Sequence, residues 1–318
     1  MAMITLVSVS GAPGVTSTAL ALASSWPRPV LVVEADPSGA SAMLAGFWRG
    51  SRGHTGVVDL VKAHRAGLLA EALLRMAIPL EGTQASVIVG ARSHEQAAGL
   101  VRLWEPLAGV LRDLSARDQD VIVDAGRLGM ERAPVPLREH ADLTLLLVRT
   151  DLPAIAAARS WAATLREESR PGRESRLLLV GPGRPYTAAE VGRALGLGVV
   201  GSISWDPVRA SVFSHGEPLP PPRGLRRLLG GSDAAAAVFA GSNYQRSITA
   251  AREAIRELVA RFQEERGQWI APLVAARGRD HERTRGTARP ARPTYVRLGP
   301  GPRRSSSWPG SGRIPLPG

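Results

Sequence analysis

The stretch ITLVSVSGAPGVTSTALALASS, residues 4 to 25, decides the fold class. Its first part, Ile4 to Val9, is almost continuously apolar and predicts a buried strand, while Thr18 to Ser25 predicts a helix. The loop between them, Ser10 to Ser17, contains two glycines. A glycine-containing loop of this kind points backbone N–H groups and the positive end of the helix dipole at one place, which suits a phosphate. The stretch therefore favours an α/β protein with an anion-binding loop near its N-terminus.

The rest of the sequence alternates short apolar runs with longer segments typical of crossover helices. Further strands are predicted at Val30 to Glu34, Ser86 to Val89, Val121 to Asp124, Leu143 to Val148, Leu177 to Val180 and Val199 to Ile203. Helices are predicted at Glu95 to Arg117, Ala154 to Glu168, Ala188 to Leu195 and Gln245 to Arg266. Apolar runs without alternation indicate strands covered on both faces, so we expect a doubly wound, mostly parallel sheet flanked by helices.

The last predicted helix is amphipathic. Its apolar residues recur at three- and four-residue spacing from Ile248 to Phe262, opposite a face on which both charge signs are mixed. We expect this helix to pack on the sheet, the alternative being a membrane-surface or partner-binding helix. The predicted organisation is a sheet domain at residues 1–230, a helical segment at 231–268 and a tail at 269–318.

Composition excludes several kinds of site. The 318 residues contain no cysteine, which removes disulfide scaffolds, thiolate nucleophiles and cysteine-ligated metals. Lys62 is the only lysine, so any site that needs a lysine has one candidate. The N-terminus lacks a basic leader with a long apolar core, and no apolar run reaches the roughly 20 residues that cross a bilayer. We therefore expect a cytoplasmic protein.

Most of the net charge of +12 lies in the last 48 residues. This segment carries +8, because ten arginines between positions 277 and 313 face only Asp280 and Glu282. It is also rich in proline, glycine and serine and poor in large aliphatic side chains, so it cannot bury enough apolar surface to offset its chain entropy. We expect the tail to be disordered.

The N-terminal loop approaches the Walker A pattern G-x-x-x-x-G-K-[ST] without completing it. Gly14 and Thr16 occupy the second glycine position and the hydroxyl position. Val15 stands at the lysine position, and Val9 stands at the first glycine position. By itself this loop is equally compatible with a plain strand-to-helix turn that binds nothing.

Two strands that end in acidic residues favour the phosphate-binding interpretation. The second strand runs into EADPSG, residues 34 to 39, and DVIVD, residues 120 to 124, ends in Asp124. Open α/β sheets bind ligands at the carboxyl ends of their strands, and a Walker B acid at such an end helps to hold Mg²⁺. The alternatives are that Asp124 caps a loop and that residues 36 to 39 form an ordinary turn.

In this order, the loop and the two strands resemble the MinD/ParA family of deviant P-loop ATPases. The family signature K-G-G-x-G-K-[ST] is followed by a strand ending D-x-D-P and by a Walker B strand ending in Asp. Two later segments are also similar to the family: ADLTLLLV at 141–148, and ALGLGVVGSISWDP at 194–207, which is similar to A-L-G-x-x-hydrophobic-G-x-I-P-x-D. The resemblance covers about residues 3 to 220 and implies a P-loop NTPase-like fold, with ATP and Mg²⁺ as cofactors and a homodimer as the assembly.

The resemblance also implies roles for individual residues. Thr16 and Asp124 would lie near Mg²⁺, and Asp36 would position the attacking water, the catalytic role. The nucleotide-binding cradle would comprise Gly11, Ala12, Pro13, Gly14, Val15, Thr16 and Ser17.

The chain departs from the family at the positions that carry charge. Both family lysines are missing, since Ser10 and Val15 occupy their places, and Pro13 lacks an N–H. Gly181-Pro182-Gly183 stands where the family often has an adenine-reading asparagine. Loss of the lysines predicts weak or absent hydrolysis unless an arginine substitutes, for which Arg127 and Arg149 are the candidates.

Three functions follow as hypotheses. The first is a MinD/ParA-like nucleotide switch or pseudo-ATPase scaffold in spatial positioning or assembly, at chromosome or plasmid partitioning, cell division, or a pilus or secretion machine, similar to the TadZ/CpaE branch. Such a protein would act at the membrane or nucleoid. The second is a protein that contacts DNA or anionic lipid non-specifically through the arginines of residues 277–313. The third is an ordinary ATPase of this fold.

Overall fold

The computed structural model describes residues 2–9, 14–51, 55–117, 119–221 and 232–286. Of residues 232, 233 and 266–286 it describes the backbone alone. The chain divides into two units, Met1–Ile270 and Ala271–Gly318. The first unit contains the sheet and the candidate site.

The sheet of the first unit has eight strands in the order β3-β4-β2-β5-β1-β6-β7-β8. All neighbouring strands are parallel except β3 and β4, which form an antiparallel edge. The strands are β1 Met3–Ser8, β2 Val30–Glu34, β3 Ile78–Pro79, β4 Ala85–Ile88, β5 Asp120–Arg127, β6 Leu143–Arg149, β7 Glu174–Val180 and β8 Val199–Ile203. The predicted doubly wound, mostly parallel sheet is confirmed. The antiparallel β3 is an addition that the sequence did not predict.

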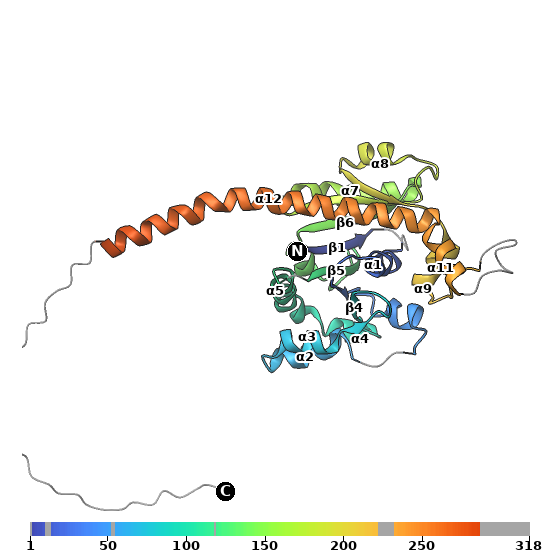
Figure 1. Cartoon of the computed structure of the whole chain (residues 1–318), viewed down its shortest axis with the longest axis horizontal. Helices are drawn as coiled ribbons and strands as arrows, with labels where there is room; N and C mark the ends of the chain where they lie inside the picture. The colour runs from blue at the N-terminus through green and yellow to red at the C-terminus, as the bar shows by residue number, and fades with distance from the viewer. Residues whose placement is uncertain (1, 10–13, 52–54, 118, 222–231, 287–318) are drawn as a thin grey trace, which may run out of the picture. The chain divides into compact units, whose positions relative to one another are not determined.

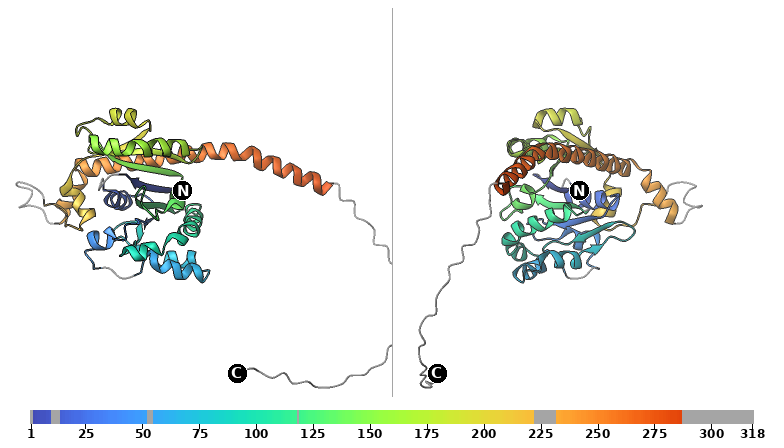
Figure 2. Two further views of the ribbon diagram at one scale, coloured as in Figure 1. Left: turned by 180° about the vertical axis from the view of Figure 1, so that it is seen from behind. Right: turned by 60° about the vertical axis from the view of Figure 1, so that its left-hand side comes forward.

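Helices cover both faces of the sheet (Figures 1 and 2). On one face lie α2 Val57–Arg65, α3 Leu69–Met76, α4 His94–Ala98, η2 Val101–Leu103, α5 Trp104–Ser115, α6 Val135–Glu139, α7 Leu152–Glu168 and α8 Ala188–Leu195. On the other lie α1 Val15–Ser24, the π-helix η1 Met43–Phe47, α9 Pro207–Ser214, α11 Ser232–Ala240 and α12 Asn243–Gly286. The strands supply both cores by alternation, as in β1, where Met3 faces one core and Ile4 the other.

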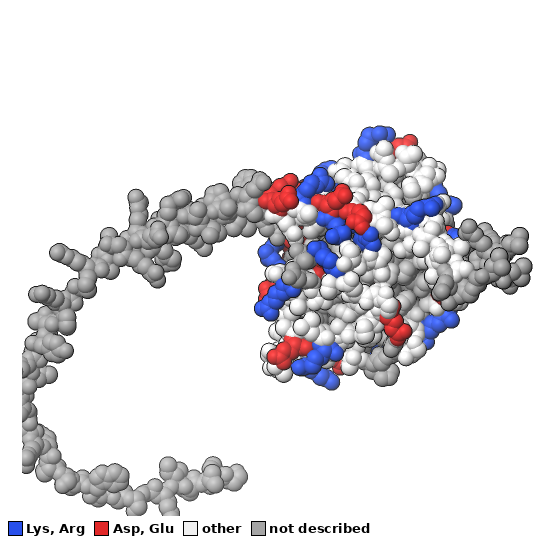
Figure 3. Space-filling model, in the orientation of Figure 1, with Lys and Arg blue, Asp and Glu red and all other residues white. Residues whose placement is uncertain are grey.

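The helix α12 packs on the sheet, as its amphipathic pattern predicts. Ile248, Ala251 and Ile255 are almost completely buried in the same core as α1 and the central strands. In the view of Figure 3, acidic and basic side chains are interspersed on the outer surface of the molecule. The backbone of α12 continues to Gly286, beyond the predicted end at Arg266.

The first part of the predicted disordered tail, residues 269 to 286, is therefore helical. Alanine and arginine, which favour helices, make up seven of these 18 residues, and Pro272 is the single proline, whereas the remaining prolines of the tail begin at Pro290. The rest of the predicted tail, 287–318, lies outside the described residues. Within the part of the chain that the structure describes, no helix combines the length and apolar character needed to cross a bilayer.

Two predicted helices have different limits. The segment Glu95 to Arg117 forms three pieces, α4, η2 and α5, because Gly99 caps the end of α4. The helix predicted from Thr18 begins at Val15, directly after Gly14. This earlier start places Thr16 and Ser17 inside the first helical turn.

Candidate functional site

The carboxyl end of β1 leads into the phosphate-loop segment and then into α1. Gly11, Ala12 and Pro13 of the predicted cradle lie outside the described residues, whereas Gly14 to Ser17 are described. Gly14 is the N-cap of α1 and has a φ of 86°, a left-handed conformation that favours glycine. A Cβ at this position would also lie 2.8 Å from Ser17 Oγ. Both observations require glycine at position 14.

The first turn of α1 offers backbone donors to an anion. The leading N–H groups of a helix have no partner within the helix, and the N-cap residue Gly14 supplies no side-chain cap. Together with the helix dipole, these donors suit a phosphate. Gly14 to Ser17 therefore fit the backbone part of a phosphate cradle.

Val15, at the lysine position, belongs to the hydrophobic core. Its side chain is 6% exposed and lies in the cluster shared by α1, β1 and α12. The side chain therefore contributes packing where the Walker A pattern supplies a positive charge.

Thr16 and Asp124 are brought together although they are 108 residues apart. The Thr16 hydroxyl donates to Asp124 Oδ2 at 2.6 Å, and the Gly126 N–H donates to Asp124 Oδ1 at 3.1 Å. Asp124 is completely buried, on β5. A hydroxyl and a carboxylate at the carboxyl edge of the sheet are the kind of oxygen donors that Mg²⁺ prefers. The two predicted metal-site residues are thus in contact, and their metal role stays a prediction.

A second buried carboxylate, Glu34, stands beside Asp124. The two residues are register partners on neighbouring strands β2 and β5. Glu34 is 1% exposed and accepts hydrogen bonds from the Ser41 hydroxyl, from Met43 N–H at 3.1 Å and from Gly90 N–H at 2.7 Å. Burial raises the pKa of Glu34 above its ordinary value, against the effect of these hydrogen bonds.

Asp36, the predicted catalytic residue, completes a group of three carboxylates. It is half-buried, accepts a hydrogen bond from Ser38 N–H at 2.8 Å and lies against Gly126. A Cβ on Gly126 would come within 2.6 Å of the Asp36 carboxylate oxygen Oδ2, so the close approach needs glycine. Its role in positioning water stays a prediction.

The three carboxylates make the site electronegative. Burial, together with the charges of Glu34 and Asp36, raises the pKa of Asp124 to about 7, against the lowering effect of the hydrogen bonds from Thr16 and Gly126. Among the described residues, the charged groups that act on the pKa of Asp124 are the carboxylates of Glu34 and Asp36. A divalent cation would supply the missing positive charge, so the donor set fits Mg²⁺ next to a phosphate. Within the described ranges, no three His, Asp or Glu side chains are arranged to hold a metal by themselves, so phosphate and water oxygens would have to complete the coordination.

The two arginines considered as lysine substitutes have different surroundings. Arg149 forms an ion pair and a cation–π contact: its Nε lies 3.1 Å from Asp151 Oδ2, and its guanidinium lies 4.6 Å from the centre of the Trp205 ring. Arg127 is exposed at the end of β5, where its Cα is paired with Ser8, the last residue of β1. Arg127 is therefore the better placed of the two.

Two features of this edge were not predicted from the sequence. The motif EADPSG indicated no role for Glu34, although its pairing with Asp124 follows from parallel register. Trp205 is 37% exposed, with Arg149 on its ring and Arg184 at 6.0 Å from the ring centre. No spacing rule links these residues, because they lie at the ends of three different strands.

Comparison with known proteins identifies the fold. No family model matches the sequence, and no curated protein matches it. Among solved structures, the cell division ATPase MinD of Pyrococcus furiosus has a TM-score of 0.61 at 16% identity, covering 81% of this chain and 100% of that one. MinD of Pyrococcus horikoshii in complex with Mg-ADP has a TM-score of 0.59 at 15% identity, covering 81% of this chain and 97% of that one. A ParA family ATPase of Chlorobium tepidum has a TM-score of 0.57 at 16% identity, covering 80% of this chain and 98% of that one. The chain therefore has a MinD/ParA-like P-loop ATPase fold.

Proposed function

We propose that this protein is a MinD/ParA-like nucleotide switch that binds nucleotide with Mg²⁺ and hydrolyses it slowly or not at all. It would act as a scaffold in spatial positioning or assembly, such as partitioning, cell division or a pilus or secretion machine. One observation carries the proposal: the Thr16–Asp124 pair is intact at the open N-terminus of α1, while the lysine position is occupied by the buried Val15.

The first turn of α1 and the Thr16–Asp124 pair support the binding of nucleotide with Mg²⁺. The N–H groups of the first turn of α1 would hold phosphate oxygens, and Thr16 with Asp124 would hold Mg²⁺. When bound, Mg²⁺ supplies positive charge that neutralises phosphate oxygens. In the neighbour from Pyrococcus horikoshii the bound ligand is Mg-ADP, which supports the same cofactor here.

The absence of a lysine at position 15 argues against fast hydrolysis of ATP. Phosphoryl transfer is catalysed mainly by positive charge placed on the transferring group, and the lysine that supplies it is replaced by Val15. Loss of charged hydrogen bonds worth about 1.5–3 kcal/mol each would slow the reaction by about ten-fold or more per bond. Asp36 and the exposed Arg127 remain as the groups that would support residual hydrolysis.

The carboxyl edge of the sheet also offers an interaction surface. Met130, Leu152 and Val208 follow β5, β6 and β8 and are 38%, 61% and 64% exposed, and Trp205 adds an exposed ring. Exposed apolar side chains at the same sheet edge as the candidate site favour a contact surface there. We assign this edge to a homodimer or a partner machine whose binding depends on the nucleotide state.

Calorimetric titration of the full chain with Mg-ATP tests the proposal. Wild type is expected to bind ATP only when Mg²⁺ is present. In Thr16→Val the affinity for ATP should no longer depend on Mg²⁺, because the substitution removes the hydroxyl beside Asp124. Ser24→Val, at the opposite end of the same helix, where the hydroxyl donates to the Ala21 carbonyl, is the matched control and should bind like wild type. Failure of wild type to bind Mg-ATP would rule the switch out.

A second candidate function rests on the charge of the tail. Ten arginines between 277 and 313 would neutralise phosphates of DNA or of anionic lipid without sequence preference. This activity is independent of the nucleotide site and would persist in Thr16→Val.

A further inference from the structure

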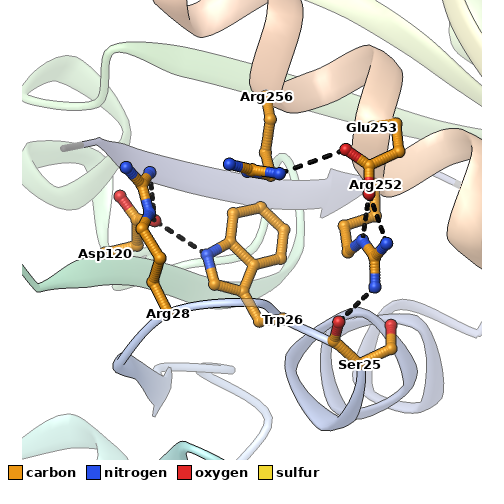
Figure 4. Close-up of polar contacts among 7 residues, drawn as sticks. All are labelled: Ser25, Trp26, Arg28, Asp120, Arg252, Glu253 and Arg256. Atoms are coloured by element: carbon orange, nitrogen blue, oxygen red, sulfur yellow. Dashed lines mark hydrogen bonds and ion pairs between the residues drawn. The ribbon is translucent and has the colours of Figure 1, made fainter.

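A second polar cluster lies at the amino end of the strands, opposite the candidate nucleotide site. Its centre is Asp120, the first residue of β5, which is completely buried. Asp120 Oδ2 accepts hydrogen bonds from Trp26 Nε1 at 2.7 Å and from the Arg28 guanidinium at 2.7 Å (Figure 4). Asp120 Oδ1 accepts from Ala2 N–H at 2.8 Å. Trp26 and Arg28 follow α1 directly, so Asp120 fixes the carboxyl end of that helix to β5.

The helix α1 is therefore held at both ends by one strand. Thr16 at its first turn donates to Asp124, and Trp26 just beyond its last turn donates to Asp120. Residues four apart on a strand point to the same face, and their separation of about 13 Å is close to the length of about 15 Å of a ten-residue helix. One continuous helix thus joins the contact at Asp124 to the contact at Asp120.

The helix α12 is attached to the same end of α1. Arg252 of α12 donates to the Ser25 carbonyl and is held by Glu253, which also accepts from Arg256 (Figure 4). The Arg252 side chain is only 15% exposed. Behind it, α1 and α12 share a continuous apolar core. α1 thus links the first turn of the candidate phosphate site to α12.

We propose that α1 couples nucleotide binding to α12, with Asp120, Trp26 and Arg252 acting as positioning residues that transmit the change. The inference rests on the proposed nucleotide binding at Gly14–Ser17. Thr16 and Asp124 would hold Mg²⁺, and the N–H groups of the first turn of α1 would hold phosphate oxygens, which would fix that turn. The opposite end of α1 then holds the Ser25 carbonyl more firmly against Arg252, which stabilises α12.

Hydrogen exchange of the full chain with and without Mg-ADP tests the coupling. In wild type, Mg-ADP is expected to slow exchange of the α12 amides 248–262 by about five-fold, the lower range of measured couplings. Arg252→Met should lose this slowing because it removes the donor to Ser25, and Arg252→Lys should restore it because lysine keeps one donor. Arg246→Met is the matched control, since Arg246 is exposed on α12 and donates to the Asn243 side chain.

Coupling is reciprocal, so Arg252→Met should also weaken Mg-ADP binding by about five-fold, as read by calorimetry. Trp26→Phe is a second variant, because it keeps a packed ring and removes the N–H to Asp120. It should weaken Mg-ADP binding in the same direction. If Arg252 and Trp26 only stabilised the fold, their substitution would lower the free energy of unfolding but would leave the effect of Mg-ADP on amide exchange of α12 unchanged.

The outcomes separate the two proposals. Mg-ADP that binds wild type but leaves exchange of residues 248–262 unchanged would overturn the coupling and leave the switch standing. The same slowing in Arg252→Met as in wild type would also overturn it. Absence of Mg-ADP binding by wild type would overturn both.

Discussion

In the proposed switch, the side chain at position 15 separates binding from turnover. Val15, the first residue of α1, belongs to the core that also contains residues of α12, at the point where the family signature has lysine. The neighbouring Thr16 is in contact with Asp124, so the proposed metal site would not depend on the lysine. Charge for the phosphates would then come from the helix N-terminus and from the metal.

Val15→Lys is expected to tighten Mg-ATP binding by about ten-fold or more, because a charged hydrogen bond contributes about 1.5–3 kcal/mol. Val15→Met replaces the apolar side chain without adding charge and is the control. Calorimetry of both variants against wild type gives the comparison. Equal affinities for the lysine and methionine variants would show that position 15 does not face bound phosphate.

The buried carboxylates predict a particular pH dependence of stability. The ordinary pKa of an aspartate is 3.8, whereas the pKa of Asp124 in the folded protein is about 7, so the folded state binds this proton more tightly than the unfolded state. The resulting stabilisation is complete below pH 3.8 and is lost as pH rises through about 7. The free energy of unfolding of the ligand-free protein should therefore fall over this range.

Asp124→Asn should flatten this pH profile, measured by chemical denaturation at a series of pH values. Part of the slope should remain, because the pKa of Glu34 is raised in the same direction. Asp113→Asn, on the exposed surface of α5, should leave the profile unchanged. A wild-type free energy of unfolding that rises from about pH 4 to about pH 7 would contradict the raised pKa of Asp124.

Among the elements, η1 packs closely against the end of α9. A Cβ on Gly46 of η1 would lie 2.2 Å from the Ser214 carbonyl oxygen, and a Cβ on Gly216 would lie 2.1 Å from the Phe47 carbonyl oxygen. These two glycines therefore allow η1 to pack directly on the end of α9. The contact fixes the segment that follows Glu34 and Asp36.

Gly46→Ala should lower the free energy of unfolding by about 1–3 kcal/mol, because neither backbone can move away without repacking. Gly109→Ala offers the opposite case: nothing lies within 4 Å of its added Cβ, in the middle of α5. It should raise stability by about 0.5–1 kcal/mol through helix propensity. Denaturant titrations that give both substitutions the same sign would contradict the close packing of η1 on α9.

The parts of the fold that follow from local sequence were predictable. β2 and β8 have the predicted limits, and the predicted helix Ala188 to Leu195 matches α8, where Thr187 and Glu190 form a capping box and Gly196 ends the helix. The helices α2, α3, α6, α9 and α11 were not predicted, because they are short and their limits depend on tertiary packing. η1 and β3 are too short to carry a periodic signal.

The site was predictable to a similar extent. The contact between Thr16 and Asp124 follows from the motif order, since both residues end up at the carboxyl edge of neighbouring strands. The hydrogen bonds of Glu34 to Ser41 and Gly90 could not be foreseen, because they depend on how two loops fold over β2. The same holds for Arg252 and Ser25, which are 227 residues apart.

Across the whole chain, most of the net positive charge lies in a different segment from the candidate site. Eight of the twelve net positive charges lie after Ile270, whereas the candidate site is acidic. The view of Figure 3 shows both charge signs interspersed on the sheet-containing unit. Any non-specific attraction to polyanions should therefore come from the tail.

Removal of residues 287–318, which takes away six of the ten arginines, should weaken binding to duplex DNA and to anionic vesicles. The slope of log K against log salt should become shallower by about 0.9 for each phosphate that the protein no longer neutralises. Fluorescence anisotropy at several salt concentrations measures this for DNA, with neutral vesicles as the lipid control. Unchanged affinity and slope would show that the tail does not bind polyanions.

The proposed switch requires that nucleotide binding depends on Mg²⁺ and that little or no bound ATP is hydrolysed. A single-turnover assay measures both binding and hydrolysis: the protein, in excess, is mixed with γ-labelled ATP, and bound nucleotide is collected on a filter and identified. We expect ATP to be retained only with Mg²⁺ and to be recovered intact after long incubation. ATP that is not retained with Mg²⁺, or that is recovered as ADP and released phosphate, would contradict the proposal.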